Sequence, residues 1–181
     1  MQDDDDHRLM ARVAEGDGAA FRVLVERHAS SLTAHATRML QSASEAEEVV
    51  QEAYIRLWKQ APRYRPEAKL RTLLYGIAHN LCIDRLRARR THDAEAVDDL
   101  CADERPSREL GDRQRSAQVQ AEIARLPERQ RAALSLVHFE ELSNIDAAAL
   151  LDISIEALES LLSRARRTLR ERLSELMDRG G

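Results

Sequence analysis

Apolar residues recur along most of this chain at the three- and four-residue spacing of an amphipathic helix. A short first helix is expected to be capped by Asp5 or Asp6 and to stop at Gly16. A longer helix is predicted over residues 18–40, because its apolar positions return to one face. That stripe consists of Phe21, Leu24, Val25, His28, Leu32 and Met39.

A third helix is predicted over residues 44–60. Ser44, followed three residues later by Glu47, fits a capping box, in which two side chains satisfy backbone amides at a helix start. The inward-facing positions are Val49, Val50, Ala53, Tyr54 and Leu57. The glutamates and Gln51 lie on a polar surface. Taken alone, the acidic surface over residues 45–52 is typical of a solvated helix face.

A loop bounded by Pro62 and Pro66 separates this helix from a fourth one. Proline lacks a backbone N–H and blocks helix continuation, so residues 61–67 are expected to be irregular. The fourth helix is predicted over residues 68–89 and ends in a cluster of arginines. Its core stripe consists of Leu70, Leu73, Leu74, Ile77, Ala78 and Leu81. We interpret residues 1–90 as one helical bundle.

The second half of the chain begins with a segment that lacks apolar periodicity. Residues 91–111 are rich in Asp and Glu, which predicts a flexible acidic linker. Helices are predicted again within residues 112–181, where Pro127 fits the first position of one helix. A short helix capped by Ser143, a tight turn and a last helix capped by Ser154 form a helix-turn-helix pattern. No segment shows the period-two pattern of a strand, so the fold class is all-α, with two small helical domains.

Charge is segregated along the chain, although the formal net charge is only -4. Basic residues dominate between Arg56 and Arg90, and they cluster again between Arg164 and Arg172, whereas residues 93–112 are mainly acidic. Two basic blocks around an acidic segment favour two surfaces that face nucleic acid and a solvated connector between them.

Several functional classes receive no support from the sequence. The histidines show no metal-ligand spacing, and no phosphate-binding glycine loop, nucleophile elbow or zinc signature is present. Cys82 and Cys101 do not suggest a disulfide framework, the N-terminus lacks the blocks of a signal peptide, and no apolar stretch approaches a membrane span. We therefore expect a cytoplasmic, non-enzymatic protein without a metal, a cofactor or a membrane-inserted segment.

The helix-turn-helix pattern is one DNA-binding candidate. In such a motif the second helix enters the major groove, and residues near its N-terminus reach base edges. Arginines further along the helix then lie near phosphates. The alternative is an ordinary helical hairpin with a solvated basic face, and the segment alone leaves both interpretations open.

A second candidate site surrounds the proline-bounded loop. Aromatic, cationic and amide side chains are interleaved there, namely Tyr64, Arg65, Lys69, Arg71, Tyr75 and Asn80. Single-stranded DNA requires this mixture, because bases stack on aromatic rings and the backbone attracts positive charge. The arginines from Arg85 to Arg90 extend the basic surface, although the helix dipole alone also favours cations at a helix C-terminus.

Taken in order, these segments resemble the extracytoplasmic-function (ECF) group of bacterial sigma factors over nearly the whole chain. The similar segments are residues 17–40 (start of region 2), 44–52 and 57–58 (polymerase-binding helix), 74–81 and 84–87 (minus-ten helix), and 126–131 and 162–166 (region 4). The resemblance implies a sigma factor that binds core RNA polymerase and directs promoter recognition, DNA opening and transcription initiation. It also implies regulation by an anti-sigma factor.

The resemblance assigns expected roles by position, with region 2 in residues 1–90 and region 4 in residues 112–181. The residues expected to bind core polymerase are Glu47, Glu48, Gln51, Glu52 and Trp58. Those expected to contact the minus-ten element are Tyr64, Arg65, Lys69, Arg71, Asn80, Arg85 and Arg87. Those expected to contact the minus-thirty-five element are Ser154, Glu156, Glu159, Ser160, Ser163, Arg164, Arg166 and Arg167.

The chain departs from the family pattern at several positions. Leu73 stands where tryptophan is common, and Asp152 replaces a common turn glycine. In the recognition helix, Glu159 and Leu161 stand where lysine and arginine are frequent, and Glu156 adds acid. Glutamate accepts a hydrogen bond from cytosine but repels phosphate, so the minus-thirty-five sequence cannot be copied from relatives. Two alternatives stay open: a stand-alone helix-turn-helix regulator of duplex DNA, and a decoy that binds an anti-sigma factor.

Overall fold

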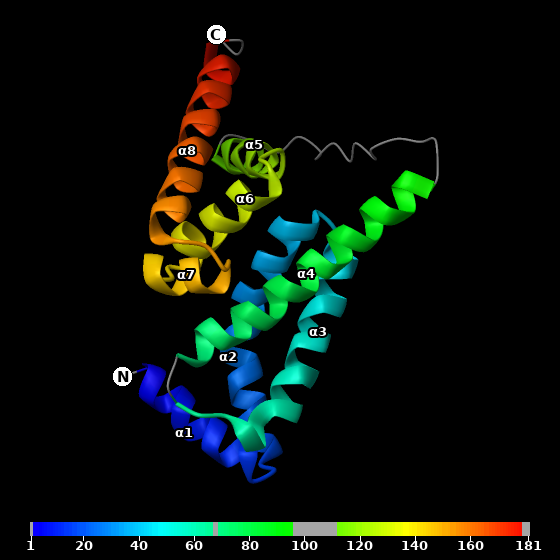
Figure 1. The fold of residues 1–181 in the computed structure, drawn as a ribbon, viewed down its shortest axis with the longest axis vertical. Helices are drawn as coiled ribbons and strands as arrows, with labels where there is room; N and C mark the ends of the chain where they lie inside the picture. Colours follow the sequence, from blue (N-terminus) through cyan, green and yellow to red (C-terminus); the bar gives the residue numbers. More distant parts are fainter. Residues whose placement is uncertain (1, 67–68, 96–111, 179–181) are drawn as a thin grey trace.

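The computed structural model describes residues 2–66, 69–95 and 112–178, and every regular element in these ranges is helical (Figure 1). This confirms the all-α prediction. The N-terminal half contains α1 (Gln2–Ala14), α2 (Gly18–Leu40), α3 (Ala43–Gln60), the 3₁₀ turn η1 (Ala61–Arg63) and α4 (Leu70–Glu95). The C-terminal half contains α5 (Asp112–Ala124), α6 (Glu128–Leu134), the π-helical turn η2 (Ser135–Phe139), α7 (Asn144–Leu150) and α8 (Ile155–Asp178).

The N-terminal bundle consists of α2, α3 and α4, with α1 packed at one end. α2 begins where predicted because the Asp17 side chain accepts hydrogen bonds from the backbone amides of Ala19 and Ala20, at 2.9 and 3.0 Å. It ends at Gln41, whose φ of 56° lies in the left-handed region that closes many helices. The predicted apolar stripe of α2 is largely buried, with Leu24 and Leu32 fully enclosed.

The start of α1 differs from the prediction. The helix begins at Gln2, so Asp6 lies inside it and does not cap it. The Asp6 carboxylate is buried and faces α2, where it bonds the His28 ring nitrogen Nε2 at 2.8 Å and forms an ion pair with Arg27. A buried acid needs such partners, because an unpaired carboxylate is costly to desolvate. Asp6 therefore fastens α1 to the bundle.

The boundaries of α3 and α4 also differ from those predicted. Ser42, not Ser44, caps α3, because Ser42 is extended and its hydroxyl accepts a 3.4 Å hydrogen bond from the Glu45 amide. α4 continues to Glu95 and so covers the first part of the expected linker. An ion pair between Arg89 and Glu45 ties this extended end of α4 to the start of α3.

The helix-turn-helix prediction is confirmed in α7 and α8. The Ser143 hydroxyl accepts a 3.0 Å hydrogen bond from the Asp146 amide at the start of α7. The Ser154 hydroxyl accepts a 3.2 Å hydrogen bond from the Ala157 amide at the start of α8. Between the two helices, Asp152 takes a φ of 52°, which explains why glycine suits this turn and why a short polar side chain tolerates it.

The helix predicted to start at Pro127 begins one residue later. Pro127 is the N-cap of α6 and not its first residue, and the regular helix stops at Leu134. The π-helical turn η2 follows, in which the Glu140 amide bonds the Ser135 carbonyl oxygen at 3.0 Å. Such wide turns occur often at functional sites, because they redirect the side chains that follow.

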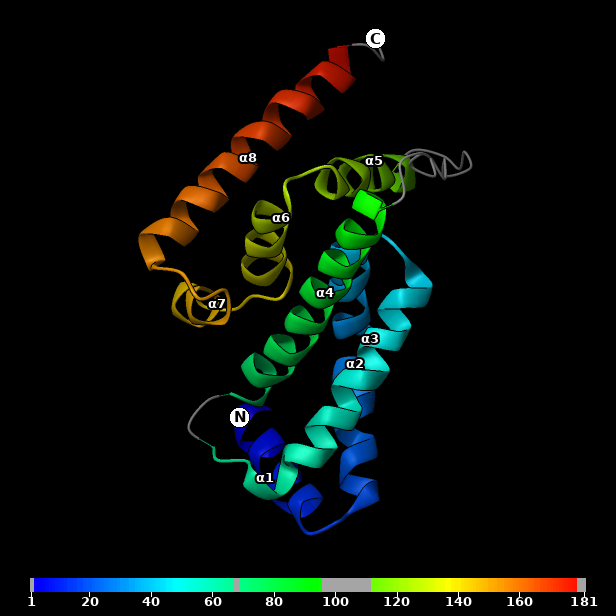
Figure 2. The same ribbon diagram turned by 45° about the vertical axis from the view of Figure 1, so that its right-hand side comes forward.

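The two halves of the chain share one apolar core. Helix α7 lies against α4 (Figures 1 and 2), whereas α5, α6 and η2 pack on α2. Buried residues of the N-terminal half, such as Ala36 and Ala78, belong to the same cluster as Leu136, Leu142 and Leu158.

The greater part of the predicted linker lies outside the described residues, so the division into residues 1–90, 91–111 and 112–181 stays a prediction. No helix in the described ranges has the length and apolar character needed to cross a bilayer.

Candidate polymerase and nucleic-acid interfaces

An exposed face of α3 carries both polar and apolar groups. Glu47 and Gln51 are exposed, and Ile55 and Trp58 continue the same face with 47% and 38% exposure. The Trp58 ring packs edge-on against Phe21, with ring centroids 5.0 Å apart. Sequence reasoning missed Ile55, although an apolar residue spaced four after Gln51 was a usable signal. An exposed apolar stripe beside acidic groups is suited to protein docking.

The remaining acidic residues of α3 are paired within the chain. Glu48 accepts a 2.7 Å hydrogen bond from Arg85 of α4, and Glu52 accepts a 2.9 Å bond from Arg56. The five residues predicted to bind polymerase therefore lie on one helix but differ in their surroundings. Glu48 and Glu52 must give up an arginine partner within the chain before they bind a group of another protein. Gln51 is exposed and is available for binding without such an exchange.

The proline-bounded loop is in contact with the N-terminal helix. The Tyr64 hydroxyl lies 2.6 Å from the His7 Nδ1 atom, and the two rings stack with centroids 5.9 Å apart. Burial raises the pKa of Tyr64, and the nearby carboxylates of Asp6 and Asp3 raise it further. Lys69 lies 3.8 Å from Asp3. Sequence reasoning missed these contacts between the loop region and α1, because nothing in the local pattern links residues so far apart.

A cavity of about 380 Å³ lies beside this loop. Its lining consists of Met10, Leu57, Gln60, Arg63, Tyr64, Arg65 and Leu73. The apolar side chains come from α1, α3 and α4, whereas the loop supplies an aromatic ring and two guanidinium groups. The cavity therefore combines an apolar floor with a cationic rim, which is the combination that a base and its phosphate require.

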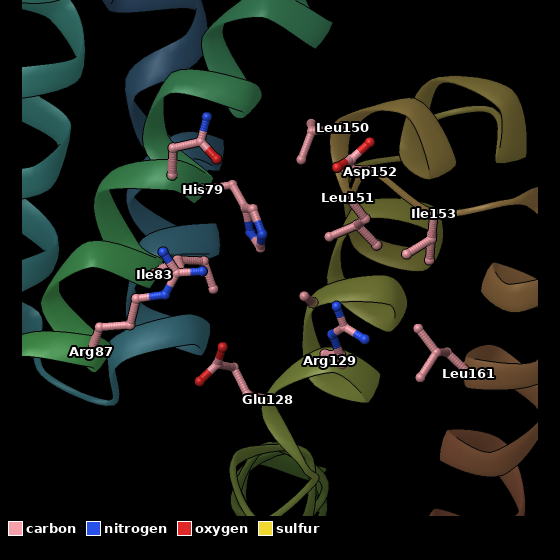
Figure 3. Close-up of a pocket in the computed structure, with 12 residues that line it drawn as sticks. His79, Ile83, Arg87, Glu128, Arg129, Leu150, Leu151, Asp152, Ile153 and Leu161 are labelled. Atoms are coloured by element: carbon pink, nitrogen blue, oxygen red, sulfur yellow. The ribbon is translucent and has the colours of Figure 1, made fainter. Parts of the chain in front are cut away.

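The predicted minus-ten residues on α4 do not form one continuous surface. Asn80 and Arg87 line a second cavity, of about 290 Å³, between α4 and the C-terminal half. Glu128 and Arg129 of α6 also line it, and Figure 3 shows Arg87 on the α4 side opposite these two residues. Arg85 instead points toward α3. Arg71 lies beside Glu140, so together with the loop site the structure divides the predicted set among four places.

The predicted residues of the recognition helix α8 share one exposed face. Every residue of that set, from Ser154 to Arg167, is exposed in the structure. Glu156, Glu159, Ser160, Ser163 and Arg164 line a shallow hollow on this face. Arg166 is engaged nearby, since its guanidinium lies 2.8 Å from the His138 Nε2 atom. The arrangement presents acids, hydroxyls and arginines together, as a groove-reading helix requires.

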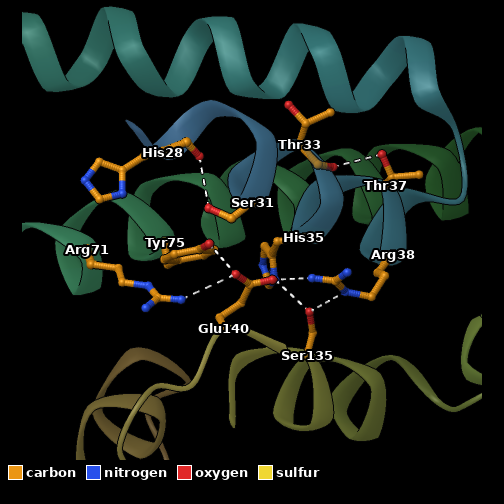
Figure 4. A network of polar contacts seen from close by, with 10 residues as sticks. All are labelled: His28, Ser31, Thr33, His35, Thr37, Arg38, Arg71, Tyr75, Ser135 and Glu140. Carbon is orange, nitrogen blue, oxygen red and sulfur yellow. Dashed lines mark hydrogen bonds and ion pairs between the residues drawn. The ribbon is translucent and has the colours of Figure 1, made fainter. Parts of the chain in front are cut away.

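A buried polar network joins the two halves and was not predicted (Figure 4). Glu140 forms an ion pair with Arg38, accepts a hydrogen bond from the Tyr75 hydroxyl and lies 3.8 Å from Arg71. Burial raises the pKa of Glu140, and these donors and cations oppose the rise. The Ser135 hydroxyl accepts a 3.0 Å hydrogen bond from Arg38 in the same network.

Two buried imidazoles lie beside this network. The His35 and His79 rings are 6.1 Å apart, and His35 Nδ1 lies 3.0 Å from the Ser135 hydroxyl. Burial lowers the pKa of His35 to about 3, with further lowering from His79 and Arg38, and burial lowers the pKa of His79 to about 4. Both rings are therefore neutral at neutral pH. Within the described ranges no three His, Cys, Asp or Glu side chains are grouped as metal ligands would be.

Comparison with known proteins places this geometry in a family. The model of sigma-70 region 2 matches residues 24–92, and that of sigma-70 region 4 matches residues 116–169. The chain is 31% identical to the RNA polymerase sigma-H factor of Pseudomonas aeruginosa, and the alignment covers 98% of each chain. It is 30% identical to the ECF RNA polymerase sigma factor SigW of Bacillus subtilis, over 93% of this chain and 97% of that one.

Solved structures agree with this assignment. The fold is similar to CnrH, a sigma factor of Cupriavidus metallidurans solved with the cytosolic domain of CnrY, with a TM-score of 0.73, 26% identity and coverage of 94% and 98% of the two chains. It is also similar to the sigma factor RpoE of Bartonella quintana in complex with the anti-sigma factor NepR, with a TM-score of 0.71, 25% identity and coverage of 85% and 96%. The chain therefore belongs to the ECF group of bacterial RNA polymerase sigma factors, which are not enzymes.

Proposed function

We propose that this sigma factor divides its work among three surfaces: the exposed face of α3, the loop with its cavity, and the outer face of α8. As a sigma factor it binds core RNA polymerase and directs promoter recognition, DNA opening and transcription initiation. Polymerase supplies the catalysis. The assignment of each task to particular residues is our proposal.

The α3 face is proposed to bind core polymerase. Gln51, Ile55 and Trp58 offer an exposed polar and apolar stripe, and Glu47 borders it. The apolar groups favour association through burial, whereas the acids favour a basic partner surface and fix its register. Glu48 contributes after it exchanges Arg85 for a group of the polymerase.

The loop cavity is proposed to hold an unpaired base of the minus-ten element. Tyr64 forms one wall and Arg65 lies at the rim, above an apolar floor that includes Leu57 and Leu73. Removal of a base from the duplex costs about a few kcal/mol, which stacking and desolvation in such a cavity can offset. Arg71, Asn80 and the other predicted minus-ten residues of α4 would then guide the strand and its phosphates.

The outer face of α8 is proposed to read the minus-thirty-five element. Its exposed residues lie at the start of the second helix of a helix-turn-helix, the part that reaches base edges. Arg164 and Arg167 can neutralise phosphates, while Glu159 and Ser160 can accept hydrogen bonds from bases.

Two further proposals concern partners and location. An anti-sigma factor is a proposed regulator, because the similar sigma factor RpoE was solved in complex with the anti-sigma factor NepR. A cytoplasmic location is proposed because core polymerase and promoter DNA are there. The stand-alone regulator and the decoy, by contrast, gain no support from an exposed docking face on α3.

The observation that carries the proposal is the apolar cavity with its cationic rim beside Tyr64. The test is transcription in vitro by core polymerase with this chain on a genomic DNA library, with permanganate mapping of unpaired thymines. We expect start sites that depend on the added chain, and loss of opening with Tyr64→Ala. Absence of any chain-dependent start site would overturn the proposed function.

A further inference from the structure

Glu140 is a residue of the C-terminal half whose side chain is satisfied by the N-terminal half. It follows the π-helical turn η2 and is 1% exposed. Its carboxylate accepts hydrogen bonds from Arg38 of α2 and from the hydroxyl of Tyr75 of α4. The second carboxylate oxygen also lies 3.8 Å from Arg71 of α4 (Figure 4).

This contact exists only while the two halves are together. A buried carboxylate is stable only when it is paired and hydrogen-bonded, and here every side-chain partner of Glu140 lies on α2 or α4. If the halves separated, water would solvate Glu140, Arg38 and Arg71, and none would remain buried without a partner. The contact therefore acts as a reversible connection between the halves.

One of these partners belongs to the proposed minus-ten site. Arg71 stacks its guanidinium over the Tyr75 ring at 5.6 Å and points its charge toward Glu140. A carboxylate between two guanidinium groups resembles a DNA phosphate in charge and in hydrogen-bonding geometry. Farther along α4, Asn80 and Arg87 line the second cavity together with residues of α6 and the α7–α8 turn. Figure 3 shows Arg87 on the α4 side of this cavity.

We propose that Glu140 is an internal competitor of promoter DNA: its carboxylate engages Arg71, Arg38 and Tyr75 and keeps region 4 over the minus-ten face of α4 until the halves separate. This inference rests on the proposed function, because it takes Arg71 and Asn80 as minus-ten residues. The closed arrangement leaves the α3 stripe and the outer face of α8 exposed. It therefore restrains contact of the opened strand with α4. It does not cover the loop cavity, whose lining includes no residue of the C-terminal half, and it does not restrain the other two tasks.

The test compares Glu140→Gln with Glu141→Gln in the full-length chain. Glu140→Gln keeps the shape of the side chain but removes its charge and turns an amide donor toward an arginine. Glu141 is the matched control, because it is the next residue and is exposed. Small-angle X-ray scattering reports separation of the halves, and anisotropy with a fluorescent random-sequence pool of single-stranded DNA reports access to the basic face of α4.

We expect Glu140→Gln to increase the radius of gyration and to tighten binding of single-stranded DNA by roughly tenfold or more, the effect of losing a charged hydrogen bond. Addition of Arg71→Gln should remove most of that gain in affinity. Glu141→Gln should match the unmodified chain in both assays. Tyr75→Phe, which removes only the hydroxyl donor, should shift both readings in the same direction by less, and it provides the test if Glu140→Gln does not fold.

Two results would overturn the inference. If Glu140→Gln and Tyr75→Phe both scatter like the unmodified chain, Glu140 does not hold the halves together. If the halves separate but single-stranded DNA binds no more tightly, the contact is a structural one and does not compete with DNA. Scattering is independent of promoter use, so a failure here is distinguishable from a failure of the transcription assay.

Discussion

Arg85 of α4 donates a 2.7 Å hydrogen bond to Glu48 of α3, and this pair links two proposed binding sites. Arg85 belongs to the proposed minus-ten set, and Glu48 belongs to the proposed polymerase-binding set. The side chains are 33% and 58% exposed, so the pair contributes little to the stability of the fold. Each residue is consequently available to an external partner at small cost.

Reversal of charge on α3 should abolish polymerase docking. Glu48→Lys combined with Glu52→Lys should prevent co-purification with core polymerase, because the two introduced lysines repel a basic partner surface. Helical content measured by circular dichroism should not change, since neither side chain is buried. Glu26→Lys, an exposed reversal on α2, is the control and should bind polymerase normally. Normal co-purification of the double variant would contradict the assignment of this face.

The apolar part of the same face should matter as much as its charge. Ile55→Ser should weaken binding of core polymerase by roughly tenfold, because a buried aliphatic side chain contributes about 1.5–3 kcal/mol to association. Thermal stability should be nearly unchanged, because Ile55 is already 47% exposed in the free chain. Ile145→Ser, at a residue that is 69% exposed on α7, provides the comparison. Equal affinities for the two variants would show that the stripe does not enter the interface.

Promoter opening and duplex binding should be separable. Tyr64→Ala or Arg65→Ala should reduce permanganate reactivity of open complexes while binding of the minus-thirty-five duplex persists. Arg164→Ala or Arg167→Ala should weaken duplex binding and lower its salt slope by about one unit, the effect expected of one lost phosphate contact. The same defect in both assays for all four variants would contradict separate DNA surfaces.

Glu159 should either set the preferred base of the minus-thirty-five element or weaken binding by repelling DNA phosphate. It lies in the exposed hollow of α8 beside Ser160 and Arg164. Glu159→Lys should strengthen duplex binding if Glu159 only repels phosphate, and should change the preferred base if its carboxylate accepts a hydrogen bond from cytosine. Selection of bound duplexes from a randomised pool distinguishes these results. An unchanged affinity and an unchanged preferred sequence would exclude Glu159 from the interface.

Stability should fall in mild acid through His35 and His79. Their folded-state pKa values of about 3 and about 4 lie below the ordinary 6.5, so the unfolded chain binds more protons between pH 4 and pH 6.5. This contribution is complete above pH 6.5 and is lost as the pH falls, by up to about 1.4 kcal/mol per pH unit for each histidine. The measurement is urea unfolding across this range.

Other titratable and charged groups surround the two imidazole rings, so a variant that lacks one ring is needed to assign the pH dependence. His35 is faced by Arg38 on its own helix, by His79 and Tyr75 on α4, and by Ser135 at the start of η2. Glu140, in the same network, has a raised pKa and titrates in the opposite sense. His79→Gln should therefore show a shallower loss of stability than the native chain, and parallel curves would contradict the prediction.

The local pattern of the sequence was sufficient for most helices. The apolar stripe placed α2 correctly, and Ser143 and Ser154 placed the helix-turn-helix. The start of α3 could not be chosen in this way, since Ser42 and Ser44 each precede a glutamate by three residues. Local spacing fits both, and the backbone conformation of the folded chain selects the first.

The contacts between distant segments were beyond sequence reasoning. Glu140 meets Tyr75 and Arg38 across separations of 65 and 102 residues, and no periodicity connects them. The same holds for His7 and Tyr64, which are 57 residues apart. Candidate site residues could be named from their types and order, but whether each one is free, paired or facing the other half depends on tertiary packing.

The apolar core that runs through both halves makes their stabilities interdependent. Leu136, Leu142 and Leu158 are packed in the same cluster as residues of α2 and α4, so separation of the halves exposes hydrocarbon to water. Each square ångström exposed in this way costs about 25 cal/mol. If the halves separate when the chain binds polymerase, the polymerase must cover a comparable apolar area. Formation of the complex would then exchange an intramolecular apolar contact for an intermolecular one.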